Sequence, residues 1–123
     1  MISLIGMNLP PSFVHAWREW RCASAPTQNY WAEARSAPTY ALECDLHDVT
    51  CSVASLVVAL HEGRAWPYAS AAGEDLAVVD HLLTALDALA LPARQARELR
   101  EYLALTRRLL LQIEHIGAGD RVT

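Results

Sequence analysis

The amino-acid sequence predicts an all-α fold, a small antiparallel bundle of three long helices with one or two short N-terminal helices. The chain of 123 residues is 53% apolar, and Ala and Leu, which lose little side-chain freedom in a helix, supply most of that fraction. Apolar residues recur at helical spacing in the last three segments. This length fits one domain, so we expect a single helical domain over residues 1–123.

The first helix is predicted to be short. Residues 1–11 form an extended lead-in, because Pro10 and Pro11 each restrict the residue before them. Ser12 can then cap a helix. One face of this helix would carry three aromatic residues: Phe13, Trp17 and Trp20.

Two prolines limit the segment that follows. Pro26 and Pro38 lie within residues 23–40, and a proline inside a helix removes a hydrogen bond and clashes with the preceding turn. We therefore expect no more than one or two helical turns there, over 28–35.

The next helix is predicted to be buried on most sides, because no charge occurs from Val49 to Leu60. Either Asp45 or Asp48 would cap its start, and Gly63 would end it. Its apolar face comprises Val49, Val53, Leu56, Val57 and Leu60, and a face of small residues comprises Ser52, Ser55 and Ala59. The β-branched residues leave a strand as the alternative.

A loop over 64–72 should lead into a helix that starts at Gly73 and runs to about residue 90, with acids in its first turn. Apolar residues span nearly half of its circumference: Leu76, Val78, Val79, Leu82, Leu83, Leu86 and Leu89. An arc that wide requires contact with more than one neighbour. Any part left exposed would favour a homodimer.

The last helix shows the clearest pattern. Pro92 suits its first position, and the helix should run from Ala93 to Ile116, end at Gly117 and leave a frayed tail over 117–123. Its inner stripe comprises Leu99, Tyr102, Leu103, Thr106, Leu109, Leu110, Ile113 and Ile116. Because the loop at 91–92 is so short, this helix should form a hairpin with the one before it.

Charge and cysteine usage narrow the classes of function. The net charge is −4, with ten Arg and no Lys, which argues against a dedicated nucleic-acid binder. The three cysteines form no CxxC pair, which favours a reducing compartment. Neither a signal peptide nor a membrane span is predicted. We therefore expect a cytoplasmic protein without a cofactor.

A sparse His/Asp pattern suggests one enzymatic alternative. His15, then His47-Asp48, then Asp80 or Asp87 resembles the metal-dependent HD phosphohydrolases. In that family, His and Asp hold a divalent metal that activates water, so the resemblance implies a metal site on His15, His47 and Asp48. The alternative is that Asp48 caps a helix and that His47 lies in a loop.

Residue type raises two further candidate chemical sites. Glu43, Asp45 and His47-Asp48 could bind a hard cation or zinc, or could form a solvated acidic loop. Cys51 is expected to be a small buried apolar residue rather than a reactive thiolate. No glycine-rich phosphate loop or GxSxG motif occurs, so no catalytic residue is assigned and no enzyme is predicted.

Two sets of residues could contact a partner. The outer face of the last helix carries Arg94, Arg97, Arg100, Arg107 and Arg108. It could grip phosphate or an acidic partner, or form ion pairs with neighbouring acids. Four aromatic residues could serve as binding anchors or pack internally: Trp20, Trp31, Trp66 and Tyr68. Of the aromatic residues, Trp66 and Tyr68 are the ones most expected to be exposed.

The preferred functional hypothesis is a small acidic helical module that binds another protein and regulates or inhibits it. Inhibitor, immunity and adaptor proteins of bacteria and phages are commonly of this size and charge, which is an analogy of type alone. The alternatives are the HD-like hydrolase and a DNA-associated regulator that uses the arginine face.

Overall fold

The computed structural model describes the backbone of residues 9–30 and 37–122, and the side chains of residues 9–23 and 41–119. The described chain forms four helices and contains no strand. The helices are α2 (Pro11–Tyr30), α3 (Ala37–His61), α4 (Tyr68–Ala88) and α5 (Ala93–Val122). The all-α prediction is confirmed, and residues 49–60 are helical throughout, so the strand alternative for them is wrong.

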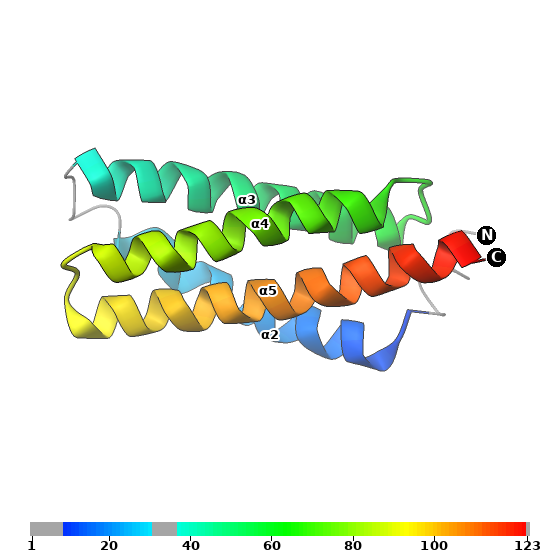
Figure 1. Ribbon diagram of the computed structural model, residues 1–123. Helices are drawn as coiled ribbons and strands as arrows, with labels where there is room; N and C mark the ends of the chain where they lie inside the picture. Colours follow the sequence, from blue (N-terminus) through cyan, green and yellow to red (C-terminus); the bar gives the residue numbers. More distant parts are fainter. Residues whose placement is uncertain (1–8, 31–36, 123) are drawn as a thin grey trace.

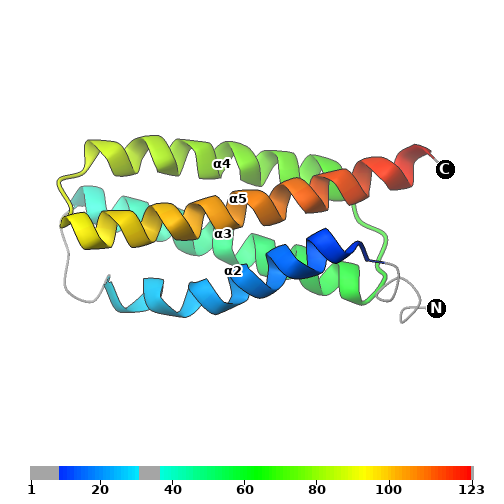
Figure 2. The same cartoon turned by 90° about the horizontal axis from the view of Figure 1, so that it is seen from below.

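The four helices lie lengthwise in a bundle in which each helix runs opposite to the one before it (Figure 1). Helix α5 packs against α4 on one side and α2 on the other, and α3 packs mainly on α4. Figure 2 shows the same arrangement from below, with α2 and α5 nearest the viewer. None of the described helices combines the length and apolar character that a membrane crossing requires.

The core contains the predicted inner faces of α3 and α5. From α5 it takes eight buried residues: Ala96, Leu99, Tyr102, Leu103, Thr106, Leu109, Leu110 and Ile113. From α3 it takes Val49, Val53, Leu56, Val57, Ala59 and Leu60, in addition to Leu42 and Leu46. The wide apolar arc of α4 is covered by these neighbours, and within that arc only Val78 is exposed, at 37%.

The N-terminal half differs from the prediction. In place of one or two short helices there is a helix of 20 residues, which continues past Pro26. Helix α3 begins at Ala37 rather than beside Asp45 or Asp48. Pro38 therefore lies in its first turn, where a backbone N–H would have no helical partner anyway. Both acids lie inside the helix and neither caps it.

Gly63 ends α3 as predicted. Its φ is 69°, a left-handed conformation that suits glycine because it has no Cβ. The Gly63 N–H donates to the carbonyl of Leu60, and the Arg64 N–H donates to that of Ala59. These two bonds form a Schellman motif.

Gly117 does not end α5, which continues to Val122. The predicted end and the frayed tail starting at residue 117 are therefore wrong. A Cβ added to Gly117 would lie 2.4 Å from the backbone nitrogen of Ala69 and 2.9 Å from the Cβ of Tyr68. The glycine is needed because the start of α4 crosses α5 at this point.

Candidate functional site

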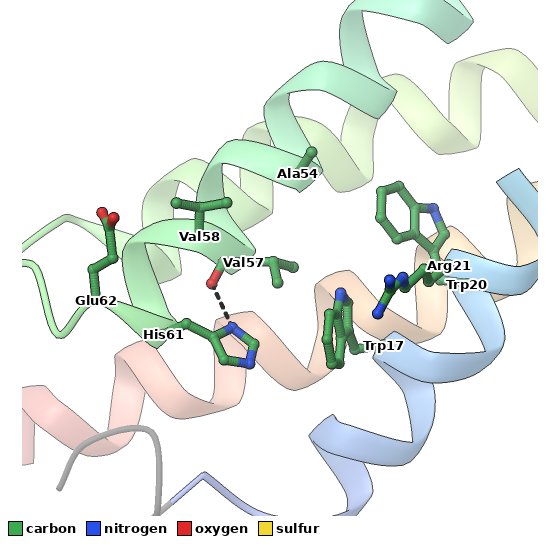
Figure 3. Close-up of a pocket in the computed structure, with 8 residues that line it drawn as sticks. All are labelled: Trp17, Trp20, Arg21, Ala54, Val57, Val58, His61 and Glu62. Atoms are coloured by element: carbon green, nitrogen blue, oxygen red, sulfur yellow. Dashed lines mark hydrogen bonds between the residues drawn. The ribbon is translucent and has the colours of Figure 1, made fainter. Parts of the chain in front are cut away.

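A groove runs between α2 and α3, on the side where the bundle is least closed. Among the described residues, these two helices make no close backbone contact, although they are consecutive in the chain. Side chains from both helices line a groove of about 370 Å³, and its surface is almost wholly apolar. The lining residues are Trp17, Trp20, Arg21, Ala54, Val57, Val58, His61 and Glu62 (Figure 3).

The two tryptophans on α2 have different roles in this groove. Trp20 is buried, and its indole N–H donates to the hydroxyl of Thr106 on α5 over 3.0 Å. Its ring also stacks on Tyr102, with ring centroids 6.3 Å apart. Trp17 is half-buried and has its ring beside that of His61. Trp20 is therefore a fixed part of the core, while Trp17 presents an aromatic wall.

His61 closes the groove beside Trp17. Its Nδ1 lies 2.9 Å from the carbonyl oxygen of Val57, and because a carbonyl can only accept, Nδ1 must carry the proton. In the neutral imidazole, Nε2 is then an acceptor. The ring centroid lies 4.9 Å from that of Trp17 and 6.2 Å from that of Phe13. The groove thus contains one oriented polar group in apolar surroundings.

Charged side chains lie at the two ends of the groove. Arg21 lies over the ring of Trp17, with its guanidinium carbon 5.5 Å from the ring centroid. Glu62 lies beyond His61 at the other end (Figure 3) and forms an ion pair with Arg64. A ligand along the groove would therefore meet a cation near one end and a carboxylate near the other.

A second groove, of about 400 Å³, lies between α3 and α4 next to the loop that joins them. Ser52, Ser55 and Ser70 are among its lining residues, together with Trp66. Ser52 donates to the carboxylate of Asp75 over 2.6 Å. This groove is more polar than the first, and its serines belong to the small-residue face of α3 and the first turn of α4.

Burial raises the pKa of Asp75 above its ordinary value of 3.8, although the hydrogen bond from Ser52 acts in the opposite direction. The folded state therefore binds a proton at Asp75 more readily than the unfolded chain does, and ionisation of this residue costs stability. Asp75→Asn should raise the free energy of unfolding at neutral pH, and this gain should disappear as the pH falls below 3.8. Urea unfolding of both proteins across this range is the measurement.

Ser52→Ala should have the opposite effect, because it removes the bond that favours the carboxylate. Its stability deficit should be larger at neutral pH than in acid. Equal effects of Asp75→Asn at both pH values would contradict the assignment.

The structure does not bring the HD-like residues together. His15 pairs with Glu19 at 2.5 Å on the exposed side of α2, whereas His47 lies one turn from Cys51 on α3. Asp48 is exposed inside α3 and is not a helix cap. Within the described residues, no three His, Cys, Asp or Glu side chains are grouped so that they could hold a metal ion. Glu43 and Asp45 belong to no such group either, and they lie in α3 rather than in an acidic loop.

The arginine face of α5 is exposed but largely neutralised. Arg94 pairs with Glu98, Arg100 with Asp87, Arg107 with Asp80 and Arg108 with Glu19, at N–O distances of 2.6 to 3.2 Å. Exposed pairs of this kind stabilise a fold by about 0–1 kcal/mol. Arg97 is exposed as well, and the described part of the chain offers it no acidic partner.

The predicted aromatic anchors fall into separate environments. Trp66 is 57% exposed, as predicted. Tyr68 is buried and donates its hydroxyl to the carbonyl of Arg64, so the expectation that it is exposed is wrong. Its position explains this, because Tyr68 begins α4 and packs under α5 rather than lying in the loop. Trp20 belongs to the core, and Trp31 lies outside the described residues.

The comparisons with known proteins add nothing to this picture. No protein-family model matches the chain, and neither a curated protein nor a solved structure matches it. The case for a function therefore depends on the geometry above.

Most of the groove was missed by reasoning from the sequence. The signal for it is the charge-free stretch Val49–Leu60, which has more apolar surface than one buried face requires. Ala54 and Val58 are exposed on α3 beside the buried residues, Val58 at 48%. Cys51 is also exposed, which corrects the expectation that it is buried.

Proposed function

We propose that this protein is a small helical binding module that takes an amphipathic helix of a partner protein into the α2/α3 groove and thereby regulates or inhibits that partner. The observation that supports this most directly is the open seam between two long helices, with apolar and aromatic side chains along it.

The groove fits the requirements of helix recognition. An amphipathic helix binds by laying apolar anchors, spaced three or four residues apart, into an apolar trough. Helices pack at interaxial distances of about 8–10 Å, and small side chains allow the closer approach. Ala54 provides a small contact point, Val58 an exposed apolar one, and Trp17 a rigid aromatic wall.

The charges at the ends would give the bound helix a direction. A partner with an acidic residue near Arg21 would have a complementary charge at that end, whereas Glu62 at the other end is already paired with Arg64. Such complementarity contributes to specificity and association rate more than to affinity. His61 Nε2 could in addition accept a hydrogen bond from a polar side chain of the partner.

The test uses a library of helical peptides whose outward positions are randomised at three- and four-residue spacing, selected against the purified protein. The selected peptides should carry apolar anchors. They should bind Val58→Glu at least tenfold more weakly than the unchanged protein, because a carboxylate would then be desolvated in the groove.

Val78→Glu is the matched control, since Val78 is also an exposed helical valine but lies on α4, away from the groove. It should bind the selected peptides with unchanged affinity. Peptides that bind the Val58 variant as tightly as the unchanged protein would refute the groove as the binding site.

Neither alternative function gains support from the described structure. The hydrolase would need His15 near His47 and Asp48, and these residues have different neighbours. A DNA-binding face would need unpaired cations, and four of its five arginines are paired with acids.

A further inference from the structure

His47 and Cys51 form a pair of potential metal ligands on the exposed face of α3. They are four residues apart, so one turn of helix places both on the same side. The Nε2 atom of His47 lies 3.6 Å from the Sγ atom of Cys51. Both residues are exposed to solvent.

This separation matches the edge of a tetrahedral zinc site. With Zn–S of about 2.3 Å and Zn–N of about 2.0–2.1 Å, a sulfur and a nitrogen ligand of the same zinc are about 3.6 Å apart. The distance between the two atoms therefore equals the one they would have as ligands of a single zinc ion. A His and a Cys with three residues between them also have the spacing found in helical ligand pairs of zinc fingers.

The pair is only half of such a site. Structural zinc has four ligands, and the described residues contain no group of three or more that could hold a metal. Cys44 lies on the same side of α3, but seven residues correspond to about 10.5 Å along the helix. Two thiolates on one zinc are about 3.8 Å apart, so Cys44 and Cys51 of one chain cannot share the ion.

We propose that His47 and Cys51 bind zinc, or a similar thiolate-seeking divalent cation, together with the same two residues from a second copy of this chain. A two-fold axis beside Cys51 would bring the two pairs together and give two nitrogen and two sulfur ligands. Two-fold dimers use the same surface of both subunits, so a half-site on one helix is sufficient.

The surface around the pair suits a second copy. Towards the C-terminal end of α3, the exposed residues Ala54, Ser55 and Val58 carry no charge and are small enough for two helices to approach closely. On the other side of the pair, Asp45 and Asp48 are exposed. Their carboxylates would repel those of a second copy in the absence of metal and would attract a cation. The dimer should therefore depend on the metal.

The binding step releases protons. Each Cys51 thiol loses its proton to solvent and forms a Zn–S bond, each neutral His47 donates the Nε2 lone pair, and the water bound to the zinc leaves. The site formed from two thiolates and one Zn²⁺ carries no net charge.

The experiment is a titration of the full chain with zinc chloride in a phosphine reductant that keeps thiols reduced, followed by sedimentation velocity and metal analysis. We expect a dimer with one zinc for two chains, reversed by a chelator. Cobalt(II) in place of zinc should give the absorption of a tetrahedral thiolate site. His47→Ala and Cys51→Ser should each weaken metal-dependent dimerisation at least tenfold.

Two variants control for general effects. Cys22→Ser and His81→Ala replace an exposed Cys on α2 and an exposed His on α4, and both should dimerise with zinc as the unchanged chain does. Three results would overturn the proposal: no zinc-dependent dimer, one zinc per chain in a monomer, or a dimer that survives the chelator. Peptide binding is measured separately on the chelator-treated chain, because Ala54 and Val58 belong both to the groove and to the surface of the proposed dimer.

Discussion

Gly117→Ala should lower the free energy of unfolding by about 2 kcal/mol, within the usual range for overpacking a close contact. In an isolated helix the same change would stabilise by up to about 1 kcal/mol, because alanine loses less backbone entropy. Here the new Cβ would lie 2.4 Å from the backbone nitrogen of Ala69. Backbone atoms cannot rotate away, so the start of α4 would have to move off α5.

Gly119→Ala is the matched control for this prediction. Gly119 lies in the same helix, two residues further on, and a Cβ there would meet nothing within 4 Å. This variant should be as stable as the unchanged protein or slightly more stable in urea unfolding. If both variants shifted stability in the same direction, the close crossing of α4 and α5 would not be the cause.

Thr106→Val should cost about 2 kcal/mol, the penalty for leaving a buried donor without a partner. Thr106 is fully buried, accepts the indole N–H of Trp20 over 3.0 Å and donates to the carbonyl of Tyr102 over 2.8 Å. Valine keeps the shape of the side chain and removes both bonds. The Trp20 N–H would then lose its 3.0 Å acceptor inside the core, where water has little access to replace it.

Thr84→Val is the matched control, because it makes the same replacement of threonine by valine in a helix but away from the core. Thr84 makes the same kind of hydrogen bond, to the carbonyl of Asp80 one turn earlier, but is exposed on α4. Its replacement should change stability by less than about 0.5 kcal/mol, as is usual at such surface positions. A similar loss of stability in both variants would show that the hydrogen bond between Trp20 on α2 and Thr106 on α5 contributes little. A red shift of tryptophan fluorescence limited to the Thr106 variant would support the link.

The buried faces of the C-terminal half could be predicted from the sequence because local pattern and tertiary packing agree there, although α4 begins at Tyr68 rather than at the predicted Gly73. The inner stripe of α5 has regular spacing along the whole helix, so one face had to be buried. Gly63 was recognisable as a helix end because it combines the end of an apolar pattern with a residue suited to positive φ.

The N-terminal half could not be predicted in the same way, because its helices depend on distant contacts. Pro26 lies inside α2, a helix held by packing on α5. A proline destabilises the helical turn before it, and contacts made elsewhere by the helix can offset that loss. Gly117 illustrates the converse, since a residue typical of helix ends is retained inside a helix for its small size.

The candidate site was only partly accessible to sequence reasoning. Trp66 was correctly expected to be exposed. However, the groove depends on how far apart α2 and α3 lie, and no periodicity encodes the distance between two helices. The pairing of His47 with Cys51 could have been found from their four-residue spacing, once the segment was known to be helical from Ala37.

The attachment of α2 to α5 has a consequence during synthesis on the ribosome. Trp20 bonds to Thr106, 86 residues later, and Arg108 pairs with Glu19. At about 5–20 residues per second, translation takes about 4–17 seconds to make the partner of Trp20 after Trp20 itself. During that interval Phe13 and Trp20 are in the nascent chain without α5 to cover them. Of the four described helices, α2 is therefore made first and waits longest for the helix on which it packs.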